Sequence, residues 1–170
     1  MLLEGGSGPG LRAANGQMWR CISDNVMGGV SSAKLERAQI DGVSALHLTG
    51  DVRLENNGGF VQMSLDLAAP GAVLDASGFS GISLWVLGND ARYNIHLRSP
   101  DMTRVWQSWR AEFHAPASWT RLDIPFSSFH PHRTDLPVNP ARLGRIGLVA
   151  IGREMRADLA LSRLELTAQG

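Results

Sequence analysis

The sequence predicts an all-β protein with the layers of a sandwich or jelly roll. Three observations support this prediction: apolar and polar residues alternate along many short segments, turn-forming residues separate these segments, and helical periodicity is almost absent. A chain of 170 residues, of which 44% are hydrophobic and 19% are charged, is large enough to bury one such core. We therefore expect a single β-sandwich domain over 16–170, preceded by a flexible N-terminal arm over 1–15.

The alternation is clearest in three segments. In 60–67 every second residue from Val61 to Leu67 is apolar, and polar residues stand between them. Segments 92–98 and 105–114 keep the same period of two, which is typical of a half-buried strand. Further strands are expected at Met18–Ile22, Ser32–Ile40, Val43–Val52, Gly81–Leu87, Trp119–Ile124, Arg145–Ile151 and Leu159–Leu166.

The connections between these strands carry turn chemistry. Asp41-Gly42 predicts a tight hairpin turn, Gly88-Asn89-Asp90 a second hairpin connection, and Asn57-Gly58-Gly59 a turn that needs positive φ. One helical turn is expected near 126–129. Segment 130–140 contains three prolines, so we expect an ordered crossover there rather than a strand.

Composition bears on partners and compartment. The 16 basic residues equal the 16 acidic ones, so a broad positive field for nucleic acid is absent and nucleic-acid binding is not expected. Cys21 stands alone and forms no intrachain disulfide, which fits a reducing compartment. The first residues lack the pattern of a secretory signal, and no apolar stretch is long enough for a transmembrane segment. We expect a cytoplasmic location.

Signals of catalysis are sparse, and we expect a non-catalytic protein without a cofactor. The sequence has no G-x-S-x-G elbow, no phosphate-binding P-loop and no HExxH motif. His130 and His132 are the closest pair of histidines, but a proline separates them and no third ligand is indicated. Loop surface is the favoured interpretation of this pair over a metal site.

The main candidate site is a polar face shared by two strands. If segments 92–98 and 105–114 pair, their polar positions share one surface that combines an aromatic ring with planar hydrogen-bonding groups. This surface would contain Asn94, His96, Arg98, Trp106, Arg110, Glu112 and His114. It could bind a sugar, a base or a peptide, or it could be an ordinary exposed sheet face with cross-strand charge pairs.

A second candidate is the pair Asp24-Asn25, which precedes Val26-Met27-Gly28-Gly29. A carboxylate at this place can accept amide hydrogen bonds and fix a sharp loop. Ligand binding and calcium ligation by Asp24 are the alternatives.

Several motifs together resemble one family. They are Trp19, the loop Ser23–Ser31 with the sequence SDNVMGGVS, Asn56–Phe60 with the sequence NNGGF, and Ile124–Phe129 with the sequence IPFSSF. In this order they resemble the complex I intermediate-associated protein 30 family. The resemblance implies a galactose-binding-like β-sandwich, similar in shape to carbohydrate-binding modules, and a role as assembly factor or chaperone for respiratory complex I. It implies no catalytic residues.

Two functions therefore stay open. The first is a protein-binding assembly factor for complex I subunits or assembly intermediates, acting through the loop 24–31 and the polar face. The second is a small-ligand module that binds a glycan or a nucleotide on the same face. RNA binding is a third reading, raised by plant relatives that join this domain to a reductase-like one, and the zero net charge argues against it.

Overall fold

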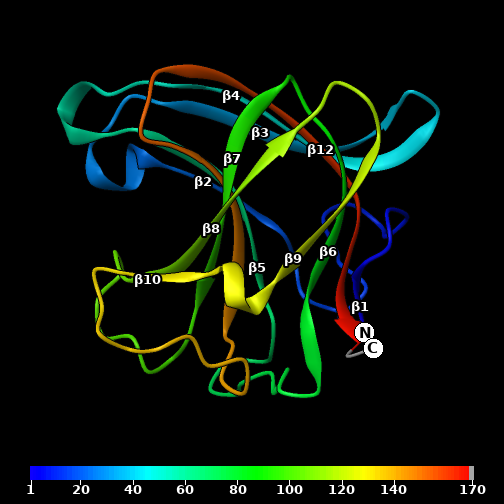
Figure 1. Cartoon of the computed structure of the whole chain (residues 1–170). Coiled ribbons are helices and arrows are strands. Elements are labelled where there is room, and N and C mark those ends of the chain that lie inside the picture. The colour runs from blue at the N-terminus through cyan, green and yellow to red at the C-terminus, as the bar shows by residue number, and fades with distance from the viewer. Residues whose placement is uncertain (169–170) are drawn as a thin grey trace.

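The computed structural model describes residues 1–168 and shows two six-stranded antiparallel sheets packed into a sandwich (Figure 1). The all-β prediction is confirmed, because the only helical segments are three short 3₁₀ turns within the described part of the chain. These are η1 Asp24–Met27, η2 Glu55–Asn57 and η3 Phe126–Ser128.

The first sheet, called here the β12 sheet, has the strand order β3-β4-β12-β6-β9, and β1 pairs with β12 beside this path. Its strands are β1 Leu2–Glu4, β3 Ser32–Ile40, β4 Val43–Val52, β6 Phe79–Leu87, β9 Thr120–Pro125 and β12 Met155–Ala168. The long β12 pairs with β4 along its first half and with β6 along its second half, so it joins the two halves of the sheet.

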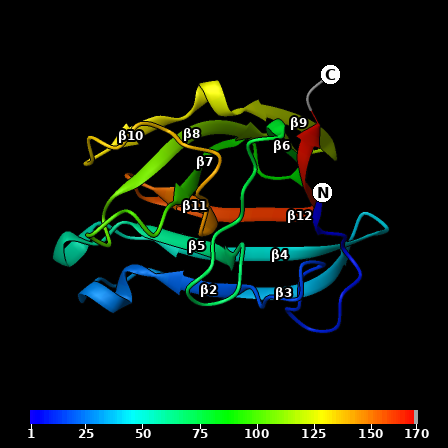
Figure 2. The same ribbon diagram turned by 90° about the horizontal axis from the view of Figure 1, so that it is seen from below.

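The second sheet, called here the β8 sheet, has the order β10-β8-β7-β11-β5-β2. Its strands are β2 Arg20–Ser23, β5 Phe60–Asp66, β7 Ala91–Arg98, β8 Ser108–Ala115, β10 His130–His132 and β11 Arg145–Ile151. Figure 2 shows both ladders from below, with β2, β5, β11, β7, β8 and β10 following one another in one and β3, β4, β12, β6 and β9 in the other.

The core lies between the sheets and takes the apolar side chains of each alternating strand. Trp19, Tyr93 and Trp109 are the largest side chains that are fully buried. The hydroxyl of Tyr93 on β7 donates to Oδ1 of Asn89 at 2.6 Å and accepts from the backbone N–H of Asp158 on β12 at 3.0 Å. The buried Tyr93 ring thus places its hydroxyl group where it links the two sheets by a hydrogen bond.

The β3–β4 hairpin turns as the sequence predicts. Asp41 and Gly42 have φ angles of 49° and 78°, and the strands are in register from Ile40 opposite Val43. Two central residues with positive φ are typical of the tight turns that match strand twist. The turn before β5 is different, because Asn56 and Gly59 carry the positive φ angles of 60° and 131°, whereas Gly58 has a φ of −77°.

The expected flexible arm is corrected in part, because Leu2–Glu4 forms strand β1 and is buried against β12. The carboxylate of Glu4 accepts hydrogen bonds from Nε1 of Trp19 at 3.0 Å and from Nη1 of Arg37 at 2.7 Å. A buried carboxylate needs such partners. The glycine-rich stretch 5–10 that follows has no regular structure. The strand before it is held by the ion pair between Glu4 and Arg37, two residues far apart in the sequence.

The expectation that 130–140 contains no strand is also corrected. His130–His132 forms the edge strand β10, with His130 opposite Arg110 and His132 opposite Ser108. An edge strand tolerates Pro131 because a proline there can turn its missing donor away from the ladder. The pairing brings two histidines beside the strand that carries Arg110.

Within the described residues, no helix has the length and apolar character that crossing a bilayer needs.

Candidate functional site

The outer face of the β8 sheet brings five of the predicted site residues together. Strands β7 and β8 pair as the sequence predicts, with Asn94 opposite Glu112 and His96 opposite Arg110. Arg98 lies one step further along β7 on the same face. Because alternate residues of these strands fill the core, their polar positions must face outward together.

Trp106 does not lie on this face, which corrects the strand predicted over 105–114. Strand β8 begins only at Ser108, and Trp106 sits in the preceding turn with 54% of its surface exposed.

Arg98 explains the shorter strand, because Nη1 of Arg98 donates to the carbonyl oxygens of Arg104, Val105 and Gln107 at 3.1, 2.7 and 2.9 Å. The guanidinium thus satisfies backbone acceptors that a strand would have paired, and the chain closes into a loop.

Asp24 lies at the opposite end of the sheet, where it fastens two loops together. Its buried carboxylate accepts from the backbone N–H and the hydroxyl of Ser31, and from the backbone N–H groups of Gly59 and Phe60. Burial alone would raise the pKa of Asp24, but these hydrogen bonds together hold it below its usual value. The loop-anchor interpretation of Asp24 is therefore the one that the geometry supports.

Asn25 supports the same loop. Its Nδ2 donates to the carbonyl oxygen of Ser31 at 2.8 Å, while the residue stays exposed. A Cβ added at Gly29 or Gly58 would come within 2.4 and 2.6 Å of the Asp24 carboxylate. Both glycines are thus explained by close approach to this carboxylate, and Gly58 does not need positive φ.

His96 is a largely buried imidazole in the middle of the face. Burial, followed by the nearby charges of Arg110 and His132, lowers the pKa of His96 to about 3, so the ring is neutral near pH 7. Its Nε2 is buried and has no hydrogen-bond partner among the described residues. A neutral imidazole keeps one donor and one acceptor, so this ring can bind a polar group of a ligand.

Ser64 carries the second buried polar atom that lacks a partner in the described chain. The register places Ser64 and His96 on either side of Gly147. A Cβ at Gly147 would lie 2.5 Å from Oε1 of Gln62, so the Gln62 side chain leans over the glycine. The sequence did not predict this row of Ser64, Gly147 and His96 across three strands, because only the pairing of β5, β11 and β7 brings the three residues together.

An open hollow of about 380 Å³ lies where β8 meets β10 on this face. Nε of Arg110 donates to Oγ of Ser108 at 2.9 Å, and none of the ion pairs within 1–168 includes Arg110 or Glu112. Desolvation, followed by the charge of Arg133, lowers the pKa of Arg110. The residues that line the hollow are Asn94, Arg110, Ala111, Glu112, Ser128, His130, Pro131 and His132.

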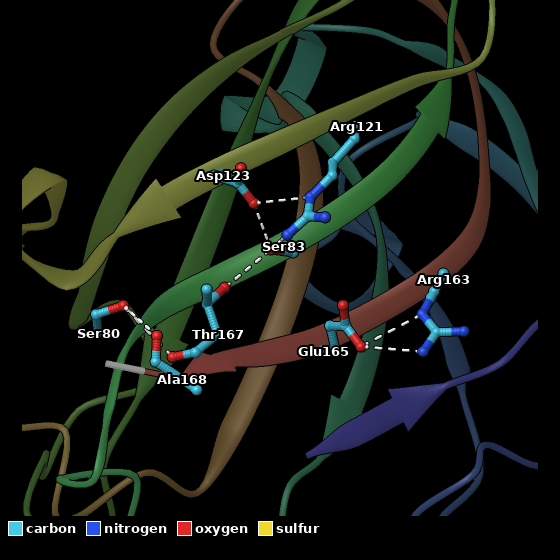
Figure 3. A network of polar contacts seen from close by, with 8 residues as sticks. All are labelled: Ser80, Ser83, Arg121, Asp123, Arg163, Glu165, Thr167 and Ala168. Atoms are coloured by element: carbon cyan, nitrogen blue, oxygen red, sulfur yellow. Dashed lines mark hydrogen bonds and ion pairs between the residues drawn. The ribbon is translucent and has the colours of Figure 1, made fainter. Parts of the chain in front are cut away.

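The outer face of the β12 sheet is arranged differently (Figure 3). Nε of Arg121 donates to Asp123 at 3.1 Å, and Nη2 of Arg163 donates to Glu165 at 3.1 Å. The two guanidinium groups lie 4.8 and 5.7 Å from the ring of Trp85 between them. Charges and ring are thus paired within the face itself.

Metal ligation has no support in the geometry. Across the residues that the structure describes, no group of three His, Cys, Asp or Glu side chains comes together as a metal centre would need. The Asp24 carboxylate is taken up by hydrogen bonds, and His130 and His132 stand on an edge strand without a third ligand.

Comparison with known proteins supplies a family and a fold. The family model described as complex I intermediate-associated protein 30 matches residues 12–162. No curated protein sequence matches the chain. Among solved structures, a family 11 carbohydrate-binding module from Clostridium thermocellum, in complex with a β-1,3-1,4-mixed-linked tetrasaccharide, aligns with a TM-score of 0.72 at 16% identity over 98% of this chain and 94% of that one.

A family 30 carbohydrate-binding module of a cellulosomal cellulase of Clostridium thermocellum aligns with a TM-score of 0.69 at 12% identity, over 99% of this chain and 96% of that one. These likenesses show the fold, and they confirm the galactose-binding-like β-sandwich that the sequence motifs implied. At such identities they assign no ligand to this chain.

Proposed function

The chain belongs to the complex I intermediate-associated protein 30 family, and on this premise we propose that it is a non-catalytic module that binds a protein partner in the cytoplasm. The partner is a subunit or assembly intermediate of respiratory complex I. The binding surface is the outer face of the β8 sheet with the loops at its two ends.

One observation carries this proposal: the outer face of the β8 sheet holds charged side chains without a counter-charge, and a buried ring nitrogen without a hydrogen bond, within the described chain. Arg110 and Glu112 form no ion pair, and Nε2 of His96 forms no hydrogen bond. Partly buried polar groups are normally satisfied, so those that are not mark a surface that another molecule completes.

Exposed apolar side chains at both ends of this face favour a protein as that molecule. Val105 and Trp106 are 81% and 54% exposed in the loop before β8, and Val26 and Met27 are 74% and 58% exposed in η1 at the other end. Apolar and aromatic side chains around directed polar groups are typical of protein interfaces. A surface that spans the sheet from end to end fits a protein better than a small ligand.

Co-purification from the protein's own cells tests the proposal. Tagged full-length chain should recover complex I subunits, identified by mass spectrometry, and Trp106→Ala and Glu112→Ala should recover less because both side chains are exposed in the free protein. Arg121→Ala on the β12 sheet is the matched control and should recover as much as the parent. Equal recovery by all four proteins, or no complex I subunit with any of them, would contradict the proposal.

Glycan binding is the second candidate, favoured by the unpaired polar row at His96 and Ser64. Sugars are usually held by stacking on an aromatic ring together with hydrogen bonds. Among the outward-facing positions of the described β8-sheet strands, the only Phe, Tyr or Trp is Phe60 at one end, so the centre of the face offers no stacking ring. Saturable quenching of tryptophan fluorescence by a mixed-linked β-glucan tetrasaccharide would favour this candidate over the protein partner.

A further inference from the structure

Arg110 carries a positive charge that the described part of the molecule leaves without a counter-ion. Its side chain is half-buried, and its Nε is fixed by Oγ of Ser108 at 2.9 Å. Neither Nη group has a hydrogen-bond or ion-pair partner within residues 1–168. Removing a charge from water without pairing it is unfavourable, so the position of Arg110 calls for an anion.

The hollow beside Arg110 has room for that anion. It measures about 380 Å³, and its far wall is the edge strand β10 with His130 and His132. The pairing of β10 with β8 sets His130 opposite Arg110, so imidazole groups stand next to the guanidinium. Imidazole N–H groups and the two free Nη groups can all donate to oxygen atoms.

The charges around the hollow distinguish between kinds of anion. Arg110 and Arg133 contribute two positive charges, and Glu112 on the rim contributes a negative one. Counting these arginine and glutamate side chains, the hollow has a single excess positive charge, which matches a carboxylate rather than a phosphate dianion. The Nη pair of a guanidinium also fits the two oxygens of a carboxylate in a fork.

We propose that this hollow is a carboxylate-binding site, in which the guanidinium of Arg110 holds the side chain of an aspartate or glutamate from the protein partner. The imidazole groups of His130 and His132 close the site on the side of the edge strand. This inference rests on the proposed function, and it identifies the chemistry that the partner presents to the face.

Nuclear magnetic resonance titration of the ¹⁵N-labelled full chain tests the site directly. The probe is N-acetylglutamic acid α-amide, with N-acetylglutaminamide as its neutral match and inorganic phosphate at equal ionic strength as the competing anion. Amide signals of β8 and β10 should shift in a saturable way with the glutamate probe only. A single carboxylate should bind with a dissociation constant on the order of millimolar, which corresponds to a binding free energy of about 4 kcal/mol.

Three variants locate the effect. Arg110→Gln should abolish the saturable shifts, and Arg110→Lys should weaken binding about tenfold because an ammonium keeps the charge but loses the fork. Arg92→Gln is the matched control, because Arg92 lies on β7, has no ion pair in the described chain and does not line the hollow. Its titration should match that of the parent. Thermal melts of all variants check that the fold is kept.

The outcomes separate this inference from the proposed function. Shifts that persist in Arg110→Gln, or phosphate that saturates the same signals at lower concentration than the glutamate probe, would overturn the carboxylate site. If Arg110→Gln loses the probe but still recovers complex I subunits as well as the parent does, the partner's carboxylate does not occupy the hollow and the inference fails while the proposed function stands. Loss of both supports it.

Discussion

The two outer faces of the sandwich differ in how they treat their charges. On the β12 sheet every Lys, Arg, Asp and Glu at an outward strand position has an ionisable partner within 4.0 Å, among the residues that the structure describes: the partner of Asp158 is the imidazole of His47, and the others have an opposite charge. On the β8 sheet the Arg20–Asp66–Arg145 cluster is paired in the same way, but Arg110 and Glu112 are not. The two faces therefore differ in that the β12 sheet pairs its outward charges within the chain, whereas the β8 sheet leaves Arg110 and Glu112 unpaired.

This difference separates side chains that stabilise the fold from side chains that are available for binding. A charged group that already has its partner contributes to stability and gains little from a new neighbour. A partly buried group without a partner contributes little to stability and gains much when a partner arrives. The comparison thus predicts opposite results for substitutions on the two faces.

The largest effect is expected at Asp24, whose partners are buried. Asp24→Ala leaves the backbone N–H groups of Ser31, Gly59 and Phe60 without an acceptor and should lower the free energy of unfolding by about 3 kcal/mol or more. Asp66→Ala is the control. The Asp66 carboxylate pairs with two arginines at the surface, so its loss should lower the free energy of unfolding by only about 0.5 kcal/mol. Urea unfolding measures both, and equal losses would contradict the loop-anchor role of Asp24.

Arg110 should show the reverse behaviour. Arg110→Ala is expected to weaken binding of a purified partner subunit by about 2 kcal/mol, since arginine is common among interface hot spots, with little change in melting temperature. Isothermal titration calorimetry measures the affinity. A clear drop in melting temperature without loss of affinity would place Arg110 among the stabilising groups and break the comparison.

A pH effect is expected from His96, because the folded protein keeps this ring neutral down to about pH 3 whereas an unfolded histidine takes up a proton near pH 6.5. The unfolded state therefore binds more protons between these values, and stability falls as the pH is lowered through this window, by at most about 1.4 kcal/mol per pH unit. His96→Gln should flatten this dependence in urea midpoints taken across the window. An unchanged slope would mean that folding does not lower the pKa of this ring.

The smallest effect is expected on the paired face. Arg163→Ala removes one exposed ion pair with Glu165 and one cation–π contact with Trp85, and should reduce stability by about 0.5 to 1 kcal/mol. Recovery of complex I subunits should not change. Loss of recovery with an unchanged melt would show that the β12 sheet also takes part in binding.

Local pattern determined much of this protein. The period of two identified segments 60–67, 92–98 and 145–151 as strands and showed which of their residues enter the core, because alternation is a local property of an extended chain. Asp41-Gly42 predicted its hairpin turn for the same reason, since the φ angles of a two-residue turn depend on those residues alone.

The choice of partners was decided only by the tertiary structure. Nothing local indicates that Glu4 would be buried against Arg37, that Arg98 would end β8 at Ser108 and leave Trp106 in a loop, or that His130 would come to lie beside Arg110. Each of these contacts joins residues that are not neighbours in the sequence and that meet in space only when the sandwich folds. A charge becomes paired or unpaired only when the strands have found their neighbours, so the sequence predicts the polar face but the assembled sheets determine which of its groups are free to bind.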